Sequence, residues 1–266
     1  MTESTPLPHT IDSLAPEFAA CGLDAGQTVV VHSAMGKIGG YIVGGAEAVI
    51  RALLKVLGDS GTLMMPTFTT ENTDPAHWVN PPVPESYWPV IRANAPTYDP
   101  AISRTRQMGQ MAELFRTWPG VLRSAHPVGS FAALGAKAAY LTENHQLLDE
   151  FGETSPIGRL YELDGYVLLL GVTHENNTSL HMAEVRATWP GKRTIRDGSA
   201  MYVNGAREWV TYETLDFDDG DFAQLGDEYE AEYHIRRGRV GNAEVRFLKQ
   251  RPLIDFAVHW IETHRQ

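Results

Sequence analysis

Short runs of apolar residues alternate, up to about Pro190, with segments whose apolar side chains recur at helical spacing. The runs Gln27–His32, Thr62–Pro66 and Tyr166–Leu170 are of the kind that a strand buried on both faces needs. Ser130–Leu134 is a further predicted strand. This alternation is typical of an α/β fold. Helices are expected at Ile11–Cys21, Ala46–Leu57, Gly109–Thr117, Ala136–Asn144 and Ile157–Leu163.

The pattern changes after Trp189-Pro190. Thr194–Val203 and Glu208–Glu213 are expected to form a β-hairpin, because Asn204-Gly205 between them is a strong turn signal. With no repeat, low-complexity tract or clean linker, residues 1–266 are expected to form a single domain with a hairpin-bearing C-terminal part. The last predicted elements are a helix at Phe222–Ile235 closed by Arg236-Arg237-Gly238, an edge strand at Val240–Phe247, and an amphipathic helix that starts at Arg251-Pro252.

The segment Thr67–Pro100, which follows the second strand, has no clear periodicity. It is rich in proline and holds several aromatic residues, among them Phe68, Trp78 and Trp88. Long stretches without regular structure are usually functional or disordered, and the aromatic side chains argue against disorder. We expect this segment to form one wall of a substrate cleft.

Composition narrows the possible partners. The 33 acidic and 22 basic residues give a net charge of −11, which argues against nucleic acid and anionic membranes as main partners. The charge is compatible with a cationic ligand, but it is also ordinary for a cytoplasmic protein. The single cysteine, Cys21, excludes an internal disulfide framework and a cysteine-rich metal site. No signal peptide and no run of transmembrane length is visible, so a cytoplasmic location is expected.

Candidate catalytic residues lie where the strand Tyr166–Leu170 is followed by a helix. Thr178 or Ser179 can cap this helix, and His181 falls in its first turn, with Glu184 three residues later on the same face. Histidine is a suitable general base near neutral pH, and a neighbouring carboxylate can orient its ring. From the pattern alone, the alternative is a partly buried helix histidine beside a surface glutamate, without a catalytic role.

A glycine-rich loop, Ser33–Gly45, joins the first strand to the next helix. Such a unit can present backbone N–H groups and a helix N-terminus to phosphate groups. It is not a Walker loop, since Ile38 follows Gly36-Lys37, and its glycine spacing is not that of the dinucleotide fingerprint. An anion-binding loop and a set of tight turns without a ligand fit the pattern equally well.

Several blocks of the sequence resemble the aminoglycoside 3-N-acetyltransferase family. They are VVVHSAMGKIGGYIVGGAEAVIRAL, TLMMPTFT, RTWPGVLRSAHPVGSFAALG, ETSPIGRLYELDGYVLLLGV and NNTSLHMAE, in the family's order over most of residues 10–190. The resemblance implies an α/β fold with a central mixed β-sheet flanked by helices. It also implies transfer of the acetyl group of acetyl-coenzyme A to the 3-amino group of a 2-deoxystreptamine antibiotic. The segment Thr67–Pro100 matches poorly, which leaves the acceptor open.

The resemblance also implies roles for individual residues. His181 becomes the base and Thr178 an oxyanion donor, while either Glu184 or Asp216 is the carboxylate that supports His181. Asp216 also resembles a position that meets the cationic substrate, with Glu213 and Glu71 as further candidates. The expected coenzyme contacts are His32, Ser33, Ala34, Met35, Gly36, Lys37, Ile38, Gly39, Val43, Gly44, Gly45, Arg106, Ser155 and Thr178.

The implied mechanism is direct transfer in a ternary complex, without a metal ion. His181 takes a proton from the acceptor amine, which then attacks the thioester carbonyl. The expected partners are coenzyme A and an aminoglycoside or another cationic amine, and the chain is expected to be a monomer or homodimer. The alternatives are the same chemistry on a non-antibiotic amine, a metal-dependent hydrolase, for which no paired-histidine motif is present, and a non-catalytic binder of cationic drugs.

Overall fold

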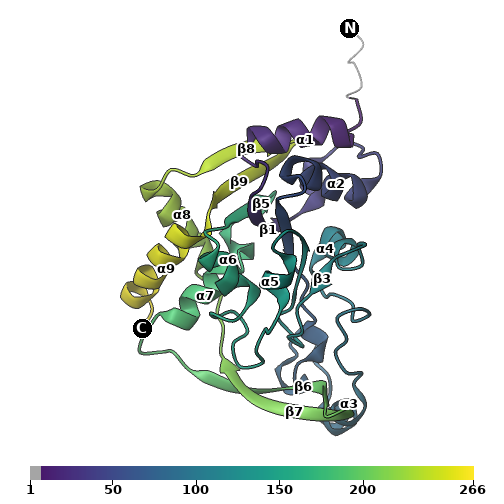
Figure 1. Ribbon diagram of the computed structural model, residues 1–266. Helices are drawn as coiled ribbons and strands as arrows, with labels where there is room; N and C mark the ends of the chain where they lie inside the picture. Colours follow the sequence, from purple (N-terminus) through teal and green to yellow (C-terminus); the bar gives the residue numbers. More distant parts are fainter. Residues whose placement is uncertain (1–6) are drawn as a thin grey trace.

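A computed structural model of this protein describes residues 7–266 (Figure 1). The strands of its main sheet are β1 (Thr28–Ser33), β2 (Thr62–Pro66), β3 (Leu122–Arg123), β4 (Phe131–Gly135), β5 (Tyr166–Leu170), β8 (Arg236–Val240) and β9 (Ala243–Lys249). They lie in the order β3-β4-β2-β1-β5-β9-β8. β1 is parallel to β2 and β5, and the remaining pairs are antiparallel. The predicted central mixed sheet is therefore confirmed.

Helices cover both faces of this sheet. Because side chains alternate along a strand, Val29 and Val31 pack into one core and Val30 into the other. The first core takes side chains from α1, α2 and α4, and the second from α5 to α9. None of these helices is long and apolar enough to cross a bilayer within residues 7–266. The helices are α1 (Ile11–Ala20), α2 (Gly45–Leu57), α3 (Trp88–Asn94), α4 (Gly109–Phe115), α5 (Ala138–Thr142), α6 (Pro156–Glu162), α7 (Ser179–Arg186), α8 (Phe222–Glu232) and α9 (Gln250–His264).

The elements predicted up to Pro190 are all present. β2 and β5 have the predicted bounds, and the other strands and helices differ from the prediction by one or two residues at an end. The reason is the strong local signal: β5 is buried along almost its whole length, as a continuous apolar run requires. Because β1, β2 and β5 are parallel, their carboxyl ends meet at one edge of the sheet, and the candidate site lies along that edge.

The prediction was wrong near the C-terminal end. α8 ends at Glu232, and Arg236-Arg237-Gly238 belongs to β8 rather than closing that helix. Val240–Phe247 is not one edge strand, because a turn at Gly241-Asn242 separates β8 from β9. Gly241 has a φ of 55°, which glycine adopts at little cost. β9 lies inside the sheet between β5 and β8, so one partner strand covers each of its edges.

A separate two-stranded sheet consists of β6 (Thr194–Val203) and β7 (Ala206–Leu215). Figure 1 shows this hairpin running below the main sheet, beside α3. The predicted hairpin is confirmed, and its turn residues Asn204 and Gly205 both have positive φ, as a type I′ turn requires.

The segment 67–100 packs against this hairpin. The Asp74 backbone N–H donates to Asp197 Oδ1 at 2.7 Å, and Ser199 Oγ donates to the Asn72 carbonyl oxygen at 2.6 Å. The segment also contains α3 and three short 3₁₀ turns, so the expectation of a wholly irregular stretch was wrong. We call residues 67–100 and 194–215 together the hairpin lobe.

Candidate functional site

His181 lies where the sequence places it, in the first turn of α7. Thr178 occupies the N-cap position of α7, one of the two predicted positions, but it has helical dihedral angles and its side chain makes no capping bond. Asn177 Oδ1 instead accepts a hydrogen bond from the Ser179 backbone N–H at 3.2 Å. The Thr178 side chain instead lines a pocket beside the helix.

His181 and Glu184 form a short hydrogen bond, with 2.5 Å between His181 Nδ1 and Glu184 Oε2. The Glu184 side chain is completely buried, and its Oε1 accepts hydrogen bonds from the Asp218 backbone N–H at 3.0 Å and from Arg265 Nη1 at 2.5 Å. A carboxylate only accepts hydrogen bonds, so His181 Nδ1 is the donor of this bond. Glu184 is therefore not the surface glutamate of the alternative interpretation.

Three aromatic rings surround the His181 imidazole. Phe151 stacks on it with the ring centroids 5.0 Å apart, and Phe217 and Phe222 lie at 5.1 and 5.0 Å in inclined orientations. The His181 side chain keeps 16 % of its surface exposed. The rings thus fix the plane of the imidazole and leave a small part of it open to a substrate.

The acidic residues expected to meet the substrate lie at three separate places. Asp216 pairs with Arg193 at 2.6 Å and does not contact His181, so Glu184 is the carboxylate at the ring. Glu71 forms an ion pair with Arg106, which joins a residue expected at the acceptor to one expected at the coenzyme phosphates. Glu213 is exposed on β7. Their contacts with substrate stay predictions.

A narrow pocket of about 100 Å³ opens at the carboxyl ends of β1 and β2. His32 lies in its wall with only 5 % of its surface exposed, and its Nε2 is buried with no hydrogen-bond partner among the described residues. Burial, with a smaller contribution from His181 and His174, lowers the pKa of His32 to about 3, so this ring is neutral. The pocket is also lined by Val31, Ser33, Met65, Pro66, Gln107, Met108, Ala112, Val172, Asn176 and Thr178.

The glycine-rich loop runs from this pocket to the start of α2. Met35–Ile38 forms a 3₁₀ turn, and Gly44 precedes α2 as its N-cap, with a φ of 87°. Gly44 makes no side-chain capping bond, and the Gly45 backbone N–H donates to the Ile42 carbonyl oxygen at 3.0 Å. Of the expected coenzyme contacts here, the Lys37 and Val43 side chains are exposed, whereas Ile38 is buried in the core beneath the loop.

Ser155, expected along the coenzyme arm, is the buried N-cap of α6. Its hydroxyl donates to the Gly152 carbonyl oxygen at 2.7 Å and accepts from the Gly158 backbone N–H at 3.2 Å. Both bonds serve the helix start, so the structure gives Ser155 a capping role, and a coenzyme contact stays a prediction.

Four residues around the pair were not predicted from the sequence: Phe151, Phe217, Phe222 and Arg265. Phe217 lies in the acidic segment LDFDDGD, residues 215–221, and Phe151 lies two residues before the matched block that begins at Glu153, but an aromatic residue in a loop gives no sign of which ring it will face. Arg265 lies far along the chain from His181 and carries no motif. Only the packing of α9 against α7 brings it to Glu184.

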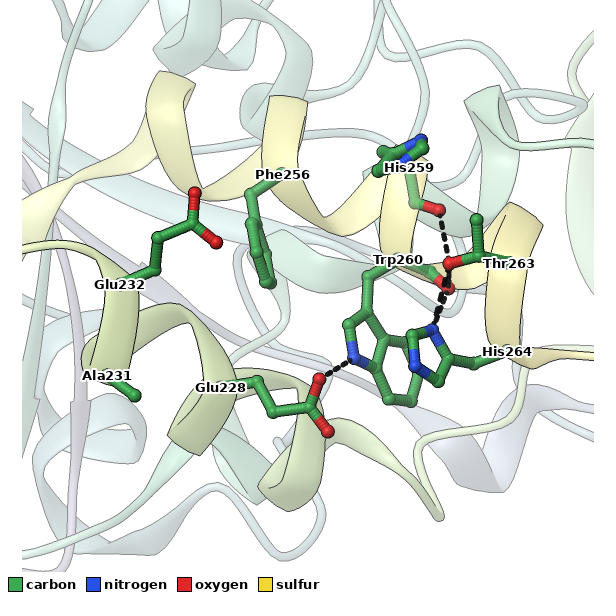
Figure 2. Close-up of a pocket in the computed structure, with 8 residues that line it drawn as sticks. All are labelled: Glu228, Ala231, Glu232, Phe256, His259, Trp260, Thr263 and His264. Carbon is green, nitrogen blue, oxygen red and sulfur yellow. Dashed lines mark hydrogen bonds between the residues drawn. The ribbon is translucent and has the colours of Figure 1, made fainter.

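A surface groove between α8 and α9, of about 440 Å³, lies apart from these residues (Figure 2). Its wall includes Trp260, whose Nε1 donates to Glu228 Oε2 at 2.6 Å, and the imidazole of His264 stacked on the indole. None of the predicted site residues lines this groove. Within residues 7–266 no group of three or more histidine, cysteine or acidic side chains is placed to hold a metal ion, and the expectation of metal-free catalysis stays a prediction.

Known proteins with similar sequences match this chain over almost its full length. A protein of Bacillus subtilis described as SPbeta prophage-derived aminoglycoside N(3′)-acetyltransferase-like protein YokD is 41 % identical over 261 residues, covering 98 % of this chain and 95 % of its own. Aminoglycoside N(3)-acetyltransferase VII of Streptomyces paromomycinus is 38 % identical over 269 residues, covering 96 % and 92 %.

Solved structures agree with these relatives. A structure described as AAC-IIIb binary with CoASH superposes with a TM-score of 0.85 at 31 % identity, covering 98 % of this chain and 100 % of that one. Another, AAC-VIa bound to sisomicin, superposes at 0.86 with 26 % identity, covering 96 % and 98 %. The sequence model of the aminoglycoside 3-N-acetyltransferase family matches residues 30–262. With the fold and these matches in agreement, the chain belongs to the aminoglycoside 3-N-acetyltransferase family.

Proposed function

We propose that this protein transfers the acetyl group of acetyl-coenzyme A to the 3-amino group of a 2-deoxystreptamine aminoglycoside. The observation that carries this proposal is the His181–Glu184 pair, in a helix that begins just after Thr178, which lines a pocket at the carboxyl edge of the sheet. Relatives crystallised with coenzyme A and with sisomicin support the two substrate classes.

The chemistry follows from the charge states of these groups. An acceptor amine is largely ammonium near pH 7, and it becomes a nucleophile only after losing a proton. His181 Nε2 takes this proton, and Glu184 stabilises the imidazolium that results. The amine nitrogen bonds to the acetyl carbon and the carbon–sulfur bond breaks. The nitrogen loses its second proton to solvent, and the proton held by His181 passes on to the leaving thiolate. Thr178, in the wall of the same pocket, would donate to the oxyanion.

The residues at the carboxyl edge fit a coenzyme with an anionic end and a narrow arm. The N-terminus of α2, with glycine at its N-cap, suits phosphate groups. The pocket at the carboxyl ends of β1 and β2 has both His32 and Thr178 in its wall. We therefore place the phosphates at the glycine-rich loop and the reactive end between His32 and Thr178.

A direct test of the function is an assay of coenzyme A release with acetyl-coenzyme A and a panel of aminoglycosides that differ at the 3-position. Acetylation of acceptors that carry a free 3-amino group, and of no acceptor lacking it, is the expected result. Release of coenzyme A with non-antibiotic amines alone would assign the same chemistry to another acceptor, and binding without release would exclude catalysis.

Replacement of Gly44 should weaken coenzyme binding through the backbone. Gly44→Val forces a β-branched residue into the left-handed region and distorts the N-cap of α2, so the Kd of coenzyme A should rise at least about tenfold, a cost of about 1.4 kcal/mol. Isothermal titration calorimetry with coenzyme A and, separately, with the acceptor measures the two affinities. Equal weakening of both would count against the assignment of this loop.

The matched control is Gly58→Val. Gly58 is the C-cap of the same helix and has a φ of 61°, and a Cβ atom added there would meet no other atom within 4 Å. Its ψ of −173° lies in a region that other residues enter at a higher cost than the left-handed region of Gly44, so the backbone cost at the opposite end of α2 is at least as large. We expect a drop in melting temperature at least as large as that of Gly44→Val, and an unchanged Kd for coenzyme A.

Salt should weaken the binding of a polycationic acceptor. The chain carries a net charge of −11, and Asp218 and Asp219 are exposed in the loop before α8. Screening of such charges should raise the acceptor KM by about two- to tenfold between low salt and 0.5 M. Steady-state kinetics at a series of NaCl concentrations, with a neutral acceptor analogue as control, measures this. A flat response would show that the acidic surface does not attract the acceptor.

A further inference from the structure

Arg265 follows the last turn of α9 and reaches the candidate base through Glu184. Its Nη1 lies 2.5 Å from Glu184 Oε1, and its Nε and Nη2 lie 2.8 and 2.6 Å from the two carboxylate oxygens of Asp221. Nη2 also donates to the Asp218 carbonyl oxygen at 2.6 Å. Only 9 % of the Arg265 side chain is exposed. The guanidinium is thus held by three groups from outside its own helix.

The same aromatic side chain supports both the guanidinium and the imidazole. The Arg265 guanidinium carbon lies 5.9 Å from the Phe222 ring centroid, and the His181 ring lies 5.0 Å from it. Trp189 packs against the guanidinium with its ring centroid at 5.3 Å. Aromatic faces attract cations and restrict their movement, so Arg265 is fixed in position as well as in charge.

Glu184 needs a cation nearby. A carboxylate with no exposed surface is costly to ionise unless it is paired and hydrogen-bonded, and one of its oxygens is already used by His181. We propose that Arg265 is a positioning residue of the active site, which keeps Glu184 ionised and oriented so that His181 presents a neutral Nε2 to the acceptor. This inference rests on the proposed role of His181 as the base.

The charges around Glu184 indicate what loss of the Arg265 charge would do. Burial disfavours the charged form of Arg265, but the bonds to Asp221 and Glu184 outweigh it and raise its pKa, so it stays cationic. Lys192 is the other cation that acts on Glu184, and its Nζ is bound to the Val185 and Ala187 carbonyl oxygens. The other titratable groups that face this site are Asp218, Asp221 and the neutral His32.

Loss of the Arg265 charge should therefore raise the proton affinity of the coupled His181–Glu184 pair. An ion partner at hydrogen-bonding distance shifts such an equilibrium by about 1–3 pH units. In Arg265→Gln, the acid limb of the pH profile of kcat/KM should move upward by about this amount. At a pH below both limbs, kcat/KM should be about 10- to 1,000-fold lower than in the unchanged protein, with recovery at higher pH.

Two further variants separate the effect of the position of the Arg265 side chain from the effect of its charge. Arg265→Lys keeps a cation but cannot bridge Glu184 and Asp221 in a fork, so we expect an acid limb near that of the unchanged protein and a lower kcat. Arg251→Gln is the matched control: Arg251 lies in the first turn of α9 and donates to the Tyr161 carbonyl oxygen, so its loss removes one charge without touching Glu184. Its pH profile should be unchanged.

The experiment measures kcat/KM from pH 5.5 to 9.5 with one acceptor for all variants, together with melting temperatures and the histidine NMR titration of the full chain. A lower melting temperature for Arg265→Gln, with an unshifted acid limb and an unshifted His181 titration, would overturn the inference and leave Arg265 as a structural residue. If Arg265→Gln proves too unstable, the kcat of Arg265→Lys decides: a normal kcat for the folded fraction would overturn the inference. Normal turnover by His181→Ala would instead overturn the proposed base.

Discussion

His181→Ala should lower kcat by about 10²–10⁴-fold, the typical contribution of general base catalysis, and leave coenzyme affinity nearly unchanged. Glu184 holds one nitrogen of the imidazole, and the His181 side chain keeps part of its surface exposed. Without this ring, the reaction depends on acceptor that has already lost its proton to solvent. The residual rate of the variant should therefore rise with pH. Steady-state kinetics over pH 6–10 measures both effects.

His126 provides the control for this experiment. It is buried and stacked on His145, and its Nδ1 accepts hydrogen bonds from the Val128 and Gly129 backbone N–H groups. An asparagine side chain can accept similar bonds two and three residues along the chain. His126→Asn should thus keep kcat near normal for the folded fraction. Loss of turnover in His126→Asn together with normal turnover in His181→Ala would show that the site is misplaced.

Two other outcomes for His181→Ala would carry different meanings. A structural histidine would show its loss as a lower melting temperature, with kcat near normal for the folded fraction. A histidine that only binds the acceptor would raise KM and spare kcat. The circular dichroism melting curve and the separate kcat and KM values distinguish these cases from the loss of a base.

Acid should destabilise the fold well above the pH at which most carboxylates protonate. Burial lowers the pKa of His32 and of His126 to about 3 and that of His145 to about 4. These rings are neutral in the fold, whereas in the unfolded chain they take up protons near pH 6.5. Their contribution to stability is present above pH 6.5 and is lost as the pH falls toward 4, by about 2 kcal/mol per histidine at pH 5.

Glu150 acts in the opposite direction. Burial raises its pKa to about 8, so its contribution to stability is present at low pH and lost as the pH rises. Near pH 5, the proton that Glu150 releases on unfolding cancels about one of the three that the histidines take up. Urea unfolding at intervals from pH 8 to 4.5 measures the balance. His126→Asn should reduce the uptake of protons on unfolding at pH 5 by about one, whereas exposed His234→Asn should leave it unchanged. An unaltered slope for His126→Asn would show that this ring is protonated in the fold.

Elements and residue pairs could be predicted from the sequence wherever a single segment contains the pattern that determines them. β5 is a run of apolar residues buried on both faces, and a helix must begin soon after it, so the place of His181 at the sheet edge follows from local pattern. The spacing of His181 and Glu184 is also local. What the sequence left open was whether Glu184 or Asp216 supports the ring, since the path of the loop before α8 decides that.

Partners that are distant along the chain could not be predicted. Arg265 and Phe151 approach His181 only because α9 and the loop before α6 pack around α7, and no periodicity marks either residue. Glu71 and Arg106 had been assigned to different ligands on resemblance, yet they pair with each other. The sign of a charge can be read from sequence, but its nearest counter-charge is set by tertiary packing.

The hairpin lobe has a consequence for how such an enzyme can evolve. Its two strands share no ladder with the seven-stranded sheet, and only the middle of β6, from Asp197 to Ala200, is continuously buried. Substitutions on exposed positions of a scaffold usually change stability by less than about 0.5 kcal/mol. Because residues 67–100 are predicted to form a wall of the substrate cleft, we expect substitutions on the lobe to change which acceptors are used while the residues around β1, β5 and α7 stay as they are.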